Sequence, residues 1–323
     1  MPPEPPVGTG LIDVHAHFVT DDYVAAATAA GHAHPDGLPY WPAWSPQEQL
    51  HLMDEQGITT AMLSMSSPGT HFGADTAARK LTRQVNEYGA DLAREHPRRF
   101  GQFASLPLPD VDGALAELAY ALDELKADGV AVMTNAAGRY LGDPAFDPVW
   151  AELDRRRTVV FVHPTSPPDP EPVSLGKPRA MLEFLFDSAR TAADLVFAGT
   201  LTRYPDIQWV FTHGGGVLPL VADRMELFRS AFLGGSADDP TVQELAGRLW
   251  YDIAGTPFPQ QVPALAAAFG TARILYGSDY CWTPAPGVAR QIAAVDAAPT
   301  PPGSANWRTL TTANAHCLLP RLA

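Results

Sequence analysis

Short apolar segments alternate along this chain with longer amphipathic segments that carry helix start and stop signals. Eight of the short segments have the length and composition of strands. The predicted strands span residues 10–18, 58–66, 100–108, 129–134, 158–164, 207–215, 249–255 and 273–280. The predicted helices span residues 45–56, 75–95, 111–128, 147–156, 181–204, 218–232, a segment from about 260, 287–297 and 307–319. Short apolar strands between amphipathic helices are typical of a parallel sheet that helices cover.

Proline and glycine mark the boundaries of several predicted helices. Ser45 directly precedes Pro46, and Glu48 follows three residues after Ser45, which is the pattern of a capped helix start. Gly57 is expected to end that helix, and Gly129 is expected to end the helix that begins at residue 111.

Eight strand–helix units are the number found in a (β/α)₈ barrel, so the predicted fold class is α/β, a single TIM barrel. An open, doubly wound sheet would show the same alternation, but no glycine-rich phosphate-binding turn follows the first strand. We expect a flexible N-terminal segment over residues 1–9 and one barrel over residues 10–323. The irregular stretch 19–44 is an insertion after the first strand, where a lid over the active-site face is expected.

Composition narrows the classes of function. Hydrophobic residues make up 46% of the 323 residues and charged residues 18%, which is ordinary for a globular protein. The formal net charge of −14, with only three lysines, argues against binding to nucleic acid or to an anionic membrane surface. No apolar run has the length of a membrane span. Two cysteines, and an N-terminus without signal-peptide features, predict a protein of the reducing cytoplasm.

Candidate chemistry begins at the end of the first strand, in the sequence Asp13-Val14-His15-Ala16-His17. Side chains alternate along a strand, so His15 and His17 face the same way with their Cα atoms about 6–7 Å apart. Such a pair can chelate one divalent ion, although two packed or exposed histidines give the same pattern. Asp13 is expected on the same face, either orienting a ligand or closing the barrel bottom with a hydrogen bond.

Three further predicted strands end in residues of the same kinds, namely His163, His213 and Asp279. Each is followed directly by proline, glycine or an aromatic residue. Barrel active sites lie at the C-terminal ends of the strands, so these residues are expected to meet His15 and His17 in one site. The other histidines lie in predicted loops or helices, where exposed or capping roles are expected: His32, His34, His51, His71, His96 and His316.

This set resembles the metal-site pattern of the amidohydrolase superfamily, which has His-x-His on strand one, histidines on strands five and six, and aspartate on strand eight. The resemblance covers nearly the whole chain, with the motifs in family order. It implies that the metal ligands are His15, His17, His163 and Asp279, and that His213 is an acid/base residue.

Other segments are similar to the amidohydrolase-related decarboxylase branch, which includes 6-methylsalicylate, aminocarboxymuconate-semialdehyde and gamma-resorcylate decarboxylases. These segments are IDVHAHF, LSMSSPG, TNAAGRYLGDPAFDPVW, GTLTRYPDIQWVFTHGGG, YGSDY and TANAHCLLPRL. The chain departs from the pattern at Cys281, beside Asp279, where relatives often have proline.

The residue at the end of the fourth predicted strand indicates how many metal ions the site holds. Family members with two metals carry a carboxylated lysine there, whereas this strand reads GVAVMTN and the nearest lysines, Lys126 and Lys177, lie outside it. One divalent ion is therefore expected, with no organic cofactor. Three histidines and a carboxylate suit Zn²⁺ best, and also suit Mn²⁺ or Co²⁺.

The resemblance implies a carbon–carbon lyase, a metal-dependent non-oxidative decarboxylase of a small aromatic (2-hydroxybenzoate-like) or unsaturated carboxylic acid. In this interpretation Asp279 ligates the metal and delivers a proton, while His213 positions either a substrate oxygen or the water on the metal. The alternative is a mononuclear metal-dependent hydrolase of a lactone, ester or amide. A non-catalytic metal-binding relative is disfavoured, because every ligand type of the family pattern is present. Relatives are commonly dimers, which implies a homodimer or higher homo-oligomer.

Contacts to the substrate are the least determined part of the site. Arg190 is a candidate cation for a substrate carboxylate, but it lies three residues after Asp187, where an ordinary ion pair within the helix is favoured. Cys281 is not expected to be a nucleophile, because no basic residue accompanies it. Aromatic residues that would either wall a flat ring or simply pack are Tyr40, Trp41, Trp44, Phe72 and Trp282.

Overall fold

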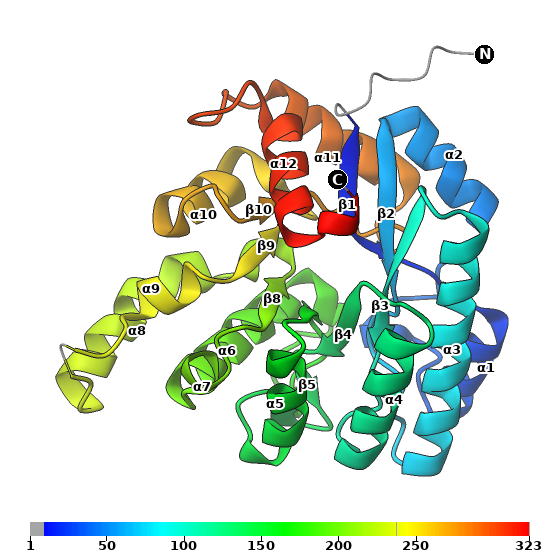
Figure 1. Ribbon diagram of the computed structural model, residues 1–323, viewed down its shortest axis with the longest axis horizontal. Coiled ribbons are helices and arrows are strands. Elements are labelled where there is room, and N and C mark those ends of the chain that lie inside the picture. The colour runs from blue at the N-terminus through cyan, green and yellow to red at the C-terminus, as the bar shows by residue number, and fades with distance from the viewer. Residues whose placement is uncertain (1–9, 237, 323) are drawn as a thin grey trace.

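The computed structural model describes residues 10–236 and 238–322, and Figure 1 shows their arrangement. Within these residues, eight parallel strands form one sheet in the order β1-β2-β3-β4-β7-β8-β9-β10. Their bounds are β1 Leu11–His17, β2 Ile58–Ser64, β3 Phe100–Ser105, β4 Gly129–Met133, β7 Val159–His163, β8 Gln208–Phe211, β9 Trp250–Asp252 and β10 Ile274–Leu275. A small antiparallel hairpin, β5 (Asn135–Ala136) and β6 (Arg139–Tyr140), follows β4.

The sheet closes where β1 meets the segment that follows β10. The Val14 N–H donates to the Tyr276 carbonyl (3.0 Å), and the His17 N–H donates to the Tyr280 carbonyl (2.6 Å). Parallel bridges join the same two segments. This closure confirms the predicted (β/α)₈ barrel and rules out the open, doubly wound sheet.

Helices surround the barrel on the outside (Figure 1). They are α1 Asp21–Ala29, α2 Pro46–Gln56, α3 Asp75–Glu95, α4 Val111–Asp123, α5 Asp147–Arg155, α6 Glu183–Phe197, α7 Thr200–Arg203, α8 Leu218–Phe232, α9 Val242–Ala246, α10 Val262–Phe269, α11 Ala285–Ala297 and α12 Trp307–Leu318. The last of these, α12, lies across the N-terminal ends of β1 and β10, where Thr312 Oγ1 donates to the Gly10 carbonyl (3.0 Å) and Asn314 Nδ2 to the Ile274 carbonyl (2.8 Å). Among the described helices, none combines the length and hydropathy needed to cross a membrane.

The insertion after β1 is more ordered than its sequence indicates. Within the stretch 19–44, α1 begins where the Thr20 side chain accepts the Tyr23 N–H. Its sequence, DDYVAAATA, has no clear apolar period, so pattern analysis missed it. The predicted flexible segment, residues 1–9, lies outside the described residues.

Two predicted helices were too long. The helix expected over 111–128 ends at Asp123, and Lys126 then takes a left-handed φ of 60°, so that Gly129 begins β4 instead of ending a helix. The helix expected over 181–204 is interrupted at Gly199, whose φ of 74° separates α6 from α7. In both cases a left-handed residue stops the helical hydrogen bonds before the amphipathic pattern ends.

The barrel interior has an apolar end and a polar end. Apolar side chains from the strands and from α12 form a buried cluster, which we call the floor cluster. Its members are Ile12, Val14, Met62, Phe103, Ala131, Val159, Phe161, Val210, Trp250, Leu275, Ala315, Leu318 and Leu319. The imidazole of His15 lies 5.1 Å from the Phe161 ring between centroids, so the polar site begins directly above this floor.

Candidate metal centre and active site

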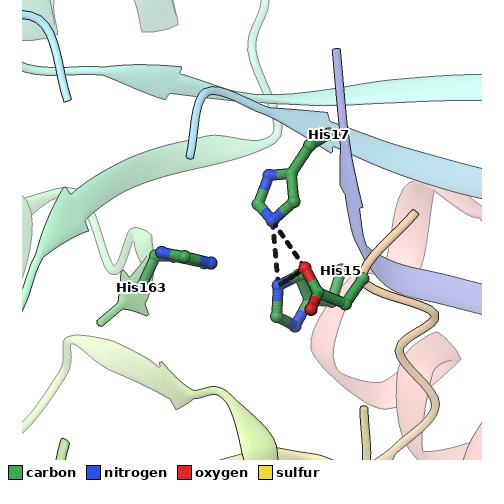
Figure 2. Close-up of side chains that lie close together, drawn as sticks. His15, His17 and His163 are labelled. Carbon is green, nitrogen blue, oxygen red and sulfur yellow. Dashed lines mark hydrogen bonds and ion pairs between the residues drawn. The ribbon is translucent and has the colours of Figure 1, made fainter. Parts of the chain in front are cut away.

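Four side chains from three strand ends meet in a group that has the composition of a metal site. His15 and His17 come from β1, His163 ends β7, and Asp279 follows β10. One ligand atom from each of these residues lies within 4.8 Å of the others. Figure 2 shows the His163 imidazole facing the His15 and His17 rings. The sequence analysis selected this same group of four.

Each of the three imidazoles is fixed through Nδ1. His15 Nδ1 lies 3.0 Å from Asp252 Oδ2, His17 Nδ1 lies 3.2 Å from the Ser64 carbonyl, and His163 Nδ1 lies 2.7 Å from the Pro164 carbonyl. An oxygen at Nδ1 favours the tautomer whose Nε2 carries a free lone pair. The Nε2 atoms accordingly converge, with 3.0 Å between those of His15 and His17.

The carboxylate completes a donor set that fits a divalent cation. Asp279 Oδ1 lies 3.4 Å from the Nε2 atoms of both His15 and His17, is buried, and has no hydrogen-bond partner among the described residues. A buried, unpartnered carboxylate oxygen beside converging imidazole lone pairs is unfavourable unless a cation joins them. Three nitrogens and one oxygen suit Zn²⁺, and also Mn²⁺ or Co²⁺.

The electrostatics keep most of these groups in the form that binds metal. Burial lowers the pKa of His17 and holds that of His163 well below its usual range, so both imidazoles are neutral. Burial alone would raise the pKa of Asp279, but the imidazoles of His15 and His17 hold it well below its usual range. His15 differs, because the charge and hydrogen bond of Asp252 outweigh burial and raise its pKa to about 10.

Backbone features bring the ligands this close. The register of β1 against β2 shifts between Asp13 and Ala16, so strict alternation does not hold through the ligand-bearing end of the strand. Gly277 lets the chain pass against His15, because a Cβ there would lie 2.7 Å from the Cβ of His15. Asp279 then adopts a left-handed φ of 57°.

His213 lies beside the ligand group in a tight turn after β8. Its ring centroid is 5.1 Å from that of His15. The backbone N–H of His213 donates to Asp252 Oδ1 (3.1 Å). Burial lowers the pKa of this imidazole. The turn needs Gly216, whose φ is 63° and where a Cβ would lie 2.0 Å from the Leu185 carbonyl oxygen. The structure therefore places His213 where the sequence analysis expected an acid/base residue.

A cavity opens from this group toward the insertion. Its lining includes His163, Asp279, His213, Phe184 and Trp282, and also Asp36 and Leu38 from the insertion. Of the aromatic residues proposed as pocket walls, only Trp282 lines the cavity among the described residues. Tyr40 is 71% exposed, and the Trp41 ring is tilted against that of Trp282 with 5.6 Å between ring centroids.

Arg190 lies in the ion pair that the sequence analysis gave as the alternative. Its Nη1 is 3.0 Å from Asp187 Oδ1, and its side chain is about half exposed. Asp187 is fully buried and also accepts hydrogen bonds from Tyr140 and Asn135. Arg190 is not among the residues that line the cavity.

Asp13 and Cys281 hold structural positions. Asp13 Oδ1 accepts the backbone N–H groups of His15 (3.0 Å) and Ser278 (2.9 Å), which ties the two ligand-bearing segments together without touching an imidazole. Burial raises the pKa of Asp13 to about 7 and that of the Cys281 thiol to about 12. A buried thiol of that kind is unreactive.

Asp252 is the residue that sequence reasoning missed. It ends β9, is fully buried, and bonds the His15 imidazole with one oxygen while the other accepts the N–H groups of His213 and Ala254. A signal was available, because Asp252 ends the apolar strand WYD just as the other site residues end theirs.

Comparison with known proteins places the chain among decarboxylases. The amidohydrolase family profile matches residues 12–321. Decarboxylase macB of Penicillium terrestre is 38% identical over 288 residues, which cover 84% of each protein. The 6-methylsalicylic acid decarboxylase acuB of Aspergillus aculeatus is 35% identical over 290 residues, covering 86% of each.

Solved structures share the fold. An amidohydrolase II crystal structure matches with a TM-score of 0.88 and 31% identity, over 96% of this chain and 100% of the other. The 5-carboxyvanillate decarboxylase of Novosphingobium aromaticivorans, complexed with manganese and 4-hydroxy-3-methoxy-5-nitrobenzoic acid, has the same fold, with a TM-score of 0.84, 22% identity and coverage of 97% and 96%. The family profile spans nearly all of the barrel, and the two decarboxylases align over more than four-fifths of the chain. The protein therefore belongs to the amidohydrolase family.

Proposed function

We propose that this protein is a metal-dependent, non-oxidative decarboxylase of a small aromatic acid of the 2-hydroxybenzoate kind. The observation that carries the proposal is the set of three imidazoles, each fixed at Nδ1, whose Nε2 atoms converge on the Asp279 carboxylate beside a cavity. The sequence relatives support the choice of reaction, since they are decarboxylases and one acts on 6-methylsalicylic acid.

One divalent ion would be held by His15, His17, His163 and Asp279. When bound, it supplies positive charge that anchors and polarises the substrate carboxylate and a neighbouring oxygen. Zn²⁺ is our first choice from the donor set, and Mn²⁺ and Co²⁺ fit the same atoms. Mn²⁺ remains a candidate because a solved structure with the same fold contains manganese. No organic cofactor is needed.

The reaction consumes one proton for each CO₂ released. The proton must reach the ring carbon before or while the C–C bond breaks, because a free aryl carbanion is too costly. The electron pair of the broken bond then restores the aromatic ring. We assign proton delivery to Asp279, which lines the cavity beside the metal group.

His213 is assigned to positioning the substrate oxygen. It lines the cavity, and its lowered pKa leaves it neutral, so it can donate or accept one hydrogen bond there. The Asp252 carboxylate holds both the His213 backbone and the His15 imidazole, which keeps the two sides of the site in register.

The test is a paired substrate panel with metal-loaded protein. We expect CO₂ from 6-methylsalicylate or another 2-hydroxybenzoate, and no hydrolysis of lactones or esters. Hydrolysis of a lactone without CO₂ from any acid would overturn the proposal in favour of a hydrolase. The His213→Asn variant should lose turnover while keeping its metal, whereas the exposed His51→Asn, on α2, should match the wild type.

We further infer that the protein is a cytoplasmic homodimer or larger homo-oligomer. The support is a row of exposed apolar side chains on and after α8, including Leu220, Phe232 and Leu233, which are 74%, 72% and 64% exposed. Cys281 and Cys317 are both free thiols, in keeping with a reducing compartment. Analytical ultracentrifugation at micromolar concentration should show a dimer or larger species, and a monomer would contradict the inferred oligomer.

A further inference from the structure

One charged residue in the cavity has no part in the metal group. Asp36 lies in the insertion between β1 and α2, is only 7% exposed, and lines the same cavity as His163 and Asp279. The ligands approach this cavity from the strand ends, whereas Asp36 approaches it from the insertion. A substrate held at the ligands would therefore present another part of its ring to this carboxylate.

Asp36 is held in place from one side only. Ser166 Oγ, in the loop after β7, donates to Asp36 Oδ1 (2.5 Å) and accepts from Arg179 Nε (3.1 Å). The Arg179 guanidinium also lies against Gly37, where a Cβ would be 2.7 Å from Nη1. This relay orients the carboxylate and sets a positive charge behind it.

The other carboxylate oxygen remains available. Among the described residues, no donor forms a hydrogen bond to Asp36 Oδ2. The Trp282 Nε1–H, a second polar group of the cavity, is buried and has no acceptor within the part of the chain that the structure describes. Because Asp36 lines the cavity, this oxygen is open to a donor from a ligand bound there.

We propose that Asp36 is a specificity-determining residue that accepts a hydrogen bond from a second ring hydroxyl of the substrate. The proposal rests on the proposed function and narrows its substrate class from 2-hydroxybenzoates to dihydroxybenzoates. A methyl group or a bare ring edge at that position leaves the carboxylate desolvated and unpaired. A site built to bond a hydroxyl discriminates strongly against the analogue that lacks it.

The backbone of Asp36 dictates which variants are informative. Its φ of 49° is left-handed, a conformation that asparagine and glycine tolerate best. Asp36→Asn therefore removes the charge, and Asp36→Gly removes the side chain, with the turn retained in both. Asp22→Asn, an exposed acid on α1 of the same insertion, is the matched control.

The experiment compares kcat/KM for 2-hydroxybenzoate with kcat/KM for its 2,3-, 2,4-, 2,5- and 2,6-dihydroxy analogues, using metal-loaded protein. We expect the wild type to prefer one dihydroxy isomer, and Asp36→Gly to reduce that preference by about 10- to 100-fold, the range for a hydrogen bond to a charged group. Asp36→Asn should reduce it less, and Asp22→Asn should leave it unchanged. A merely structural role would lower all five values by the same factor, and that result would overturn the proposal.

Binding separates this proposal from the assigned reaction. Dissociation constants of the same five acids, measured by calorimetry, require no turnover. If no acid loses CO₂ but the dihydroxy preference in binding disappears in Asp36→Gly, the decarboxylase proposal fails and the role of Asp36 stands. If CO₂ is released but the wild type prefers no dihydroxy isomer, or the variant keeps the preference, the role of Asp36 is wrong and the decarboxylase proposal stands.

Discussion

The floor cluster and the metal group are both buried, but they are built from opposite kinds of side chain. We call the end of the barrel that holds the metal group, His213 and Asp252 the mouth. At the floor, Phe103 stacks on Phe161 with 5.4 Å between ring centroids, among apolar neighbours. At the mouth, the fully buried His15 contacts Phe161 on one side and Asp252 on the other. The apolar core and the charged site are therefore in direct contact.

This contrast indicates which part of the barrel stabilises the fold and which part carries the chemistry. Burial of apolar area at the floor stabilises the fold in proportion to the area removed from water. Buried polar groups at the mouth gain little net free energy from their hydrogen bonds, and an unpartnered atom such as Asp279 Oδ1 destabilises the metal-free fold. We therefore expect floor variants to change stability and mouth variants to change metal binding and activity.

The largest effect is expected from removing a ligand. His15→Ala deletes one of two imidazoles that share the Asp279 oxygen, so bound metal should fall from about one per chain to almost none. Activity should drop by about 10³-fold or more, since charge stabilisation by the ion is lost. Mass spectrometry of metal content and CO₂ assays measure both quantities. Full metal content in His15→Ala would contradict the assignment of the site.

The floor provides the converse test. Phe103→Ala leaves a cavity beside Phe161 and should lower the free energy of unfolding by about 3–5 kcal/mol. Metal content should stay at the wild-type level, because Phe103 belongs to the apolar cluster and not to the ligand group. Urea denaturation measures the first quantity. The exposed Tyr40→Ala serves as control, and loss of metal from folded Phe103→Ala would contradict the separation of stability from metal binding.

Asp252 tests whether the polar mouth depends on orientation as well as on its ligands. Asp252→Asn replaces the acceptor beside His15 Nδ1 with an amide, which can donate there and so favour the tautomer with a proton on Nε2. Metal affinity should fall by about 10- to 100-fold. The matched control is Asp187→Asn, another fully buried carboxylate whose bonds go to Tyr140, Asn135 and Arg190. Titration with a metal-sensitive dye should show weaker binding in the first variant only.

The smallest effect is expected outside the barrel. Hydrogen bonds from Arg155 and Arg156 lower the pKa of Glu152 on α5 to about 2. A carboxyl whose pKa is lower in the folded state stabilises the fold above its unfolded pKa, and that contribution is lost as the pH falls from about 4.5 toward about 2. For this partly exposed pair we expect less than about 1 kcal/mol. The difference in melting temperature between wild type and Glu152→Gln should therefore shrink from pH 6 to pH 3, and a constant difference would contradict the pairing.

Much of this molecule was predictable because its signals are local. The eight strands are apolar runs bounded by turn residues. The four ligand candidates lie at the ends of three of these strands, in the order of a known family. The boundaries that were wrong, at Asp123 and Gly199, depend on single left-handed residues that apolar spacing does not reveal. The helix α1 was missed because an alanine-rich segment has no marked apolar face.

By itself, the sequence determined the barrel, and it predicted a one-metal donor set of His15, His17, His163 and Asp279 with His213 at a neighbouring strand end. Only the tertiary structure decided which partner fixes each imidazole, because Asp252 lies 237 positions from His15 along the chain. It also decided that Arg190 pairs with Asp187, and that Asp36 lines the cavity with one oxygen bonded to Ser166. The physical reason is that residue type and spacing set what a side chain is able to bind, whereas the closed barrel sets which atoms it meets.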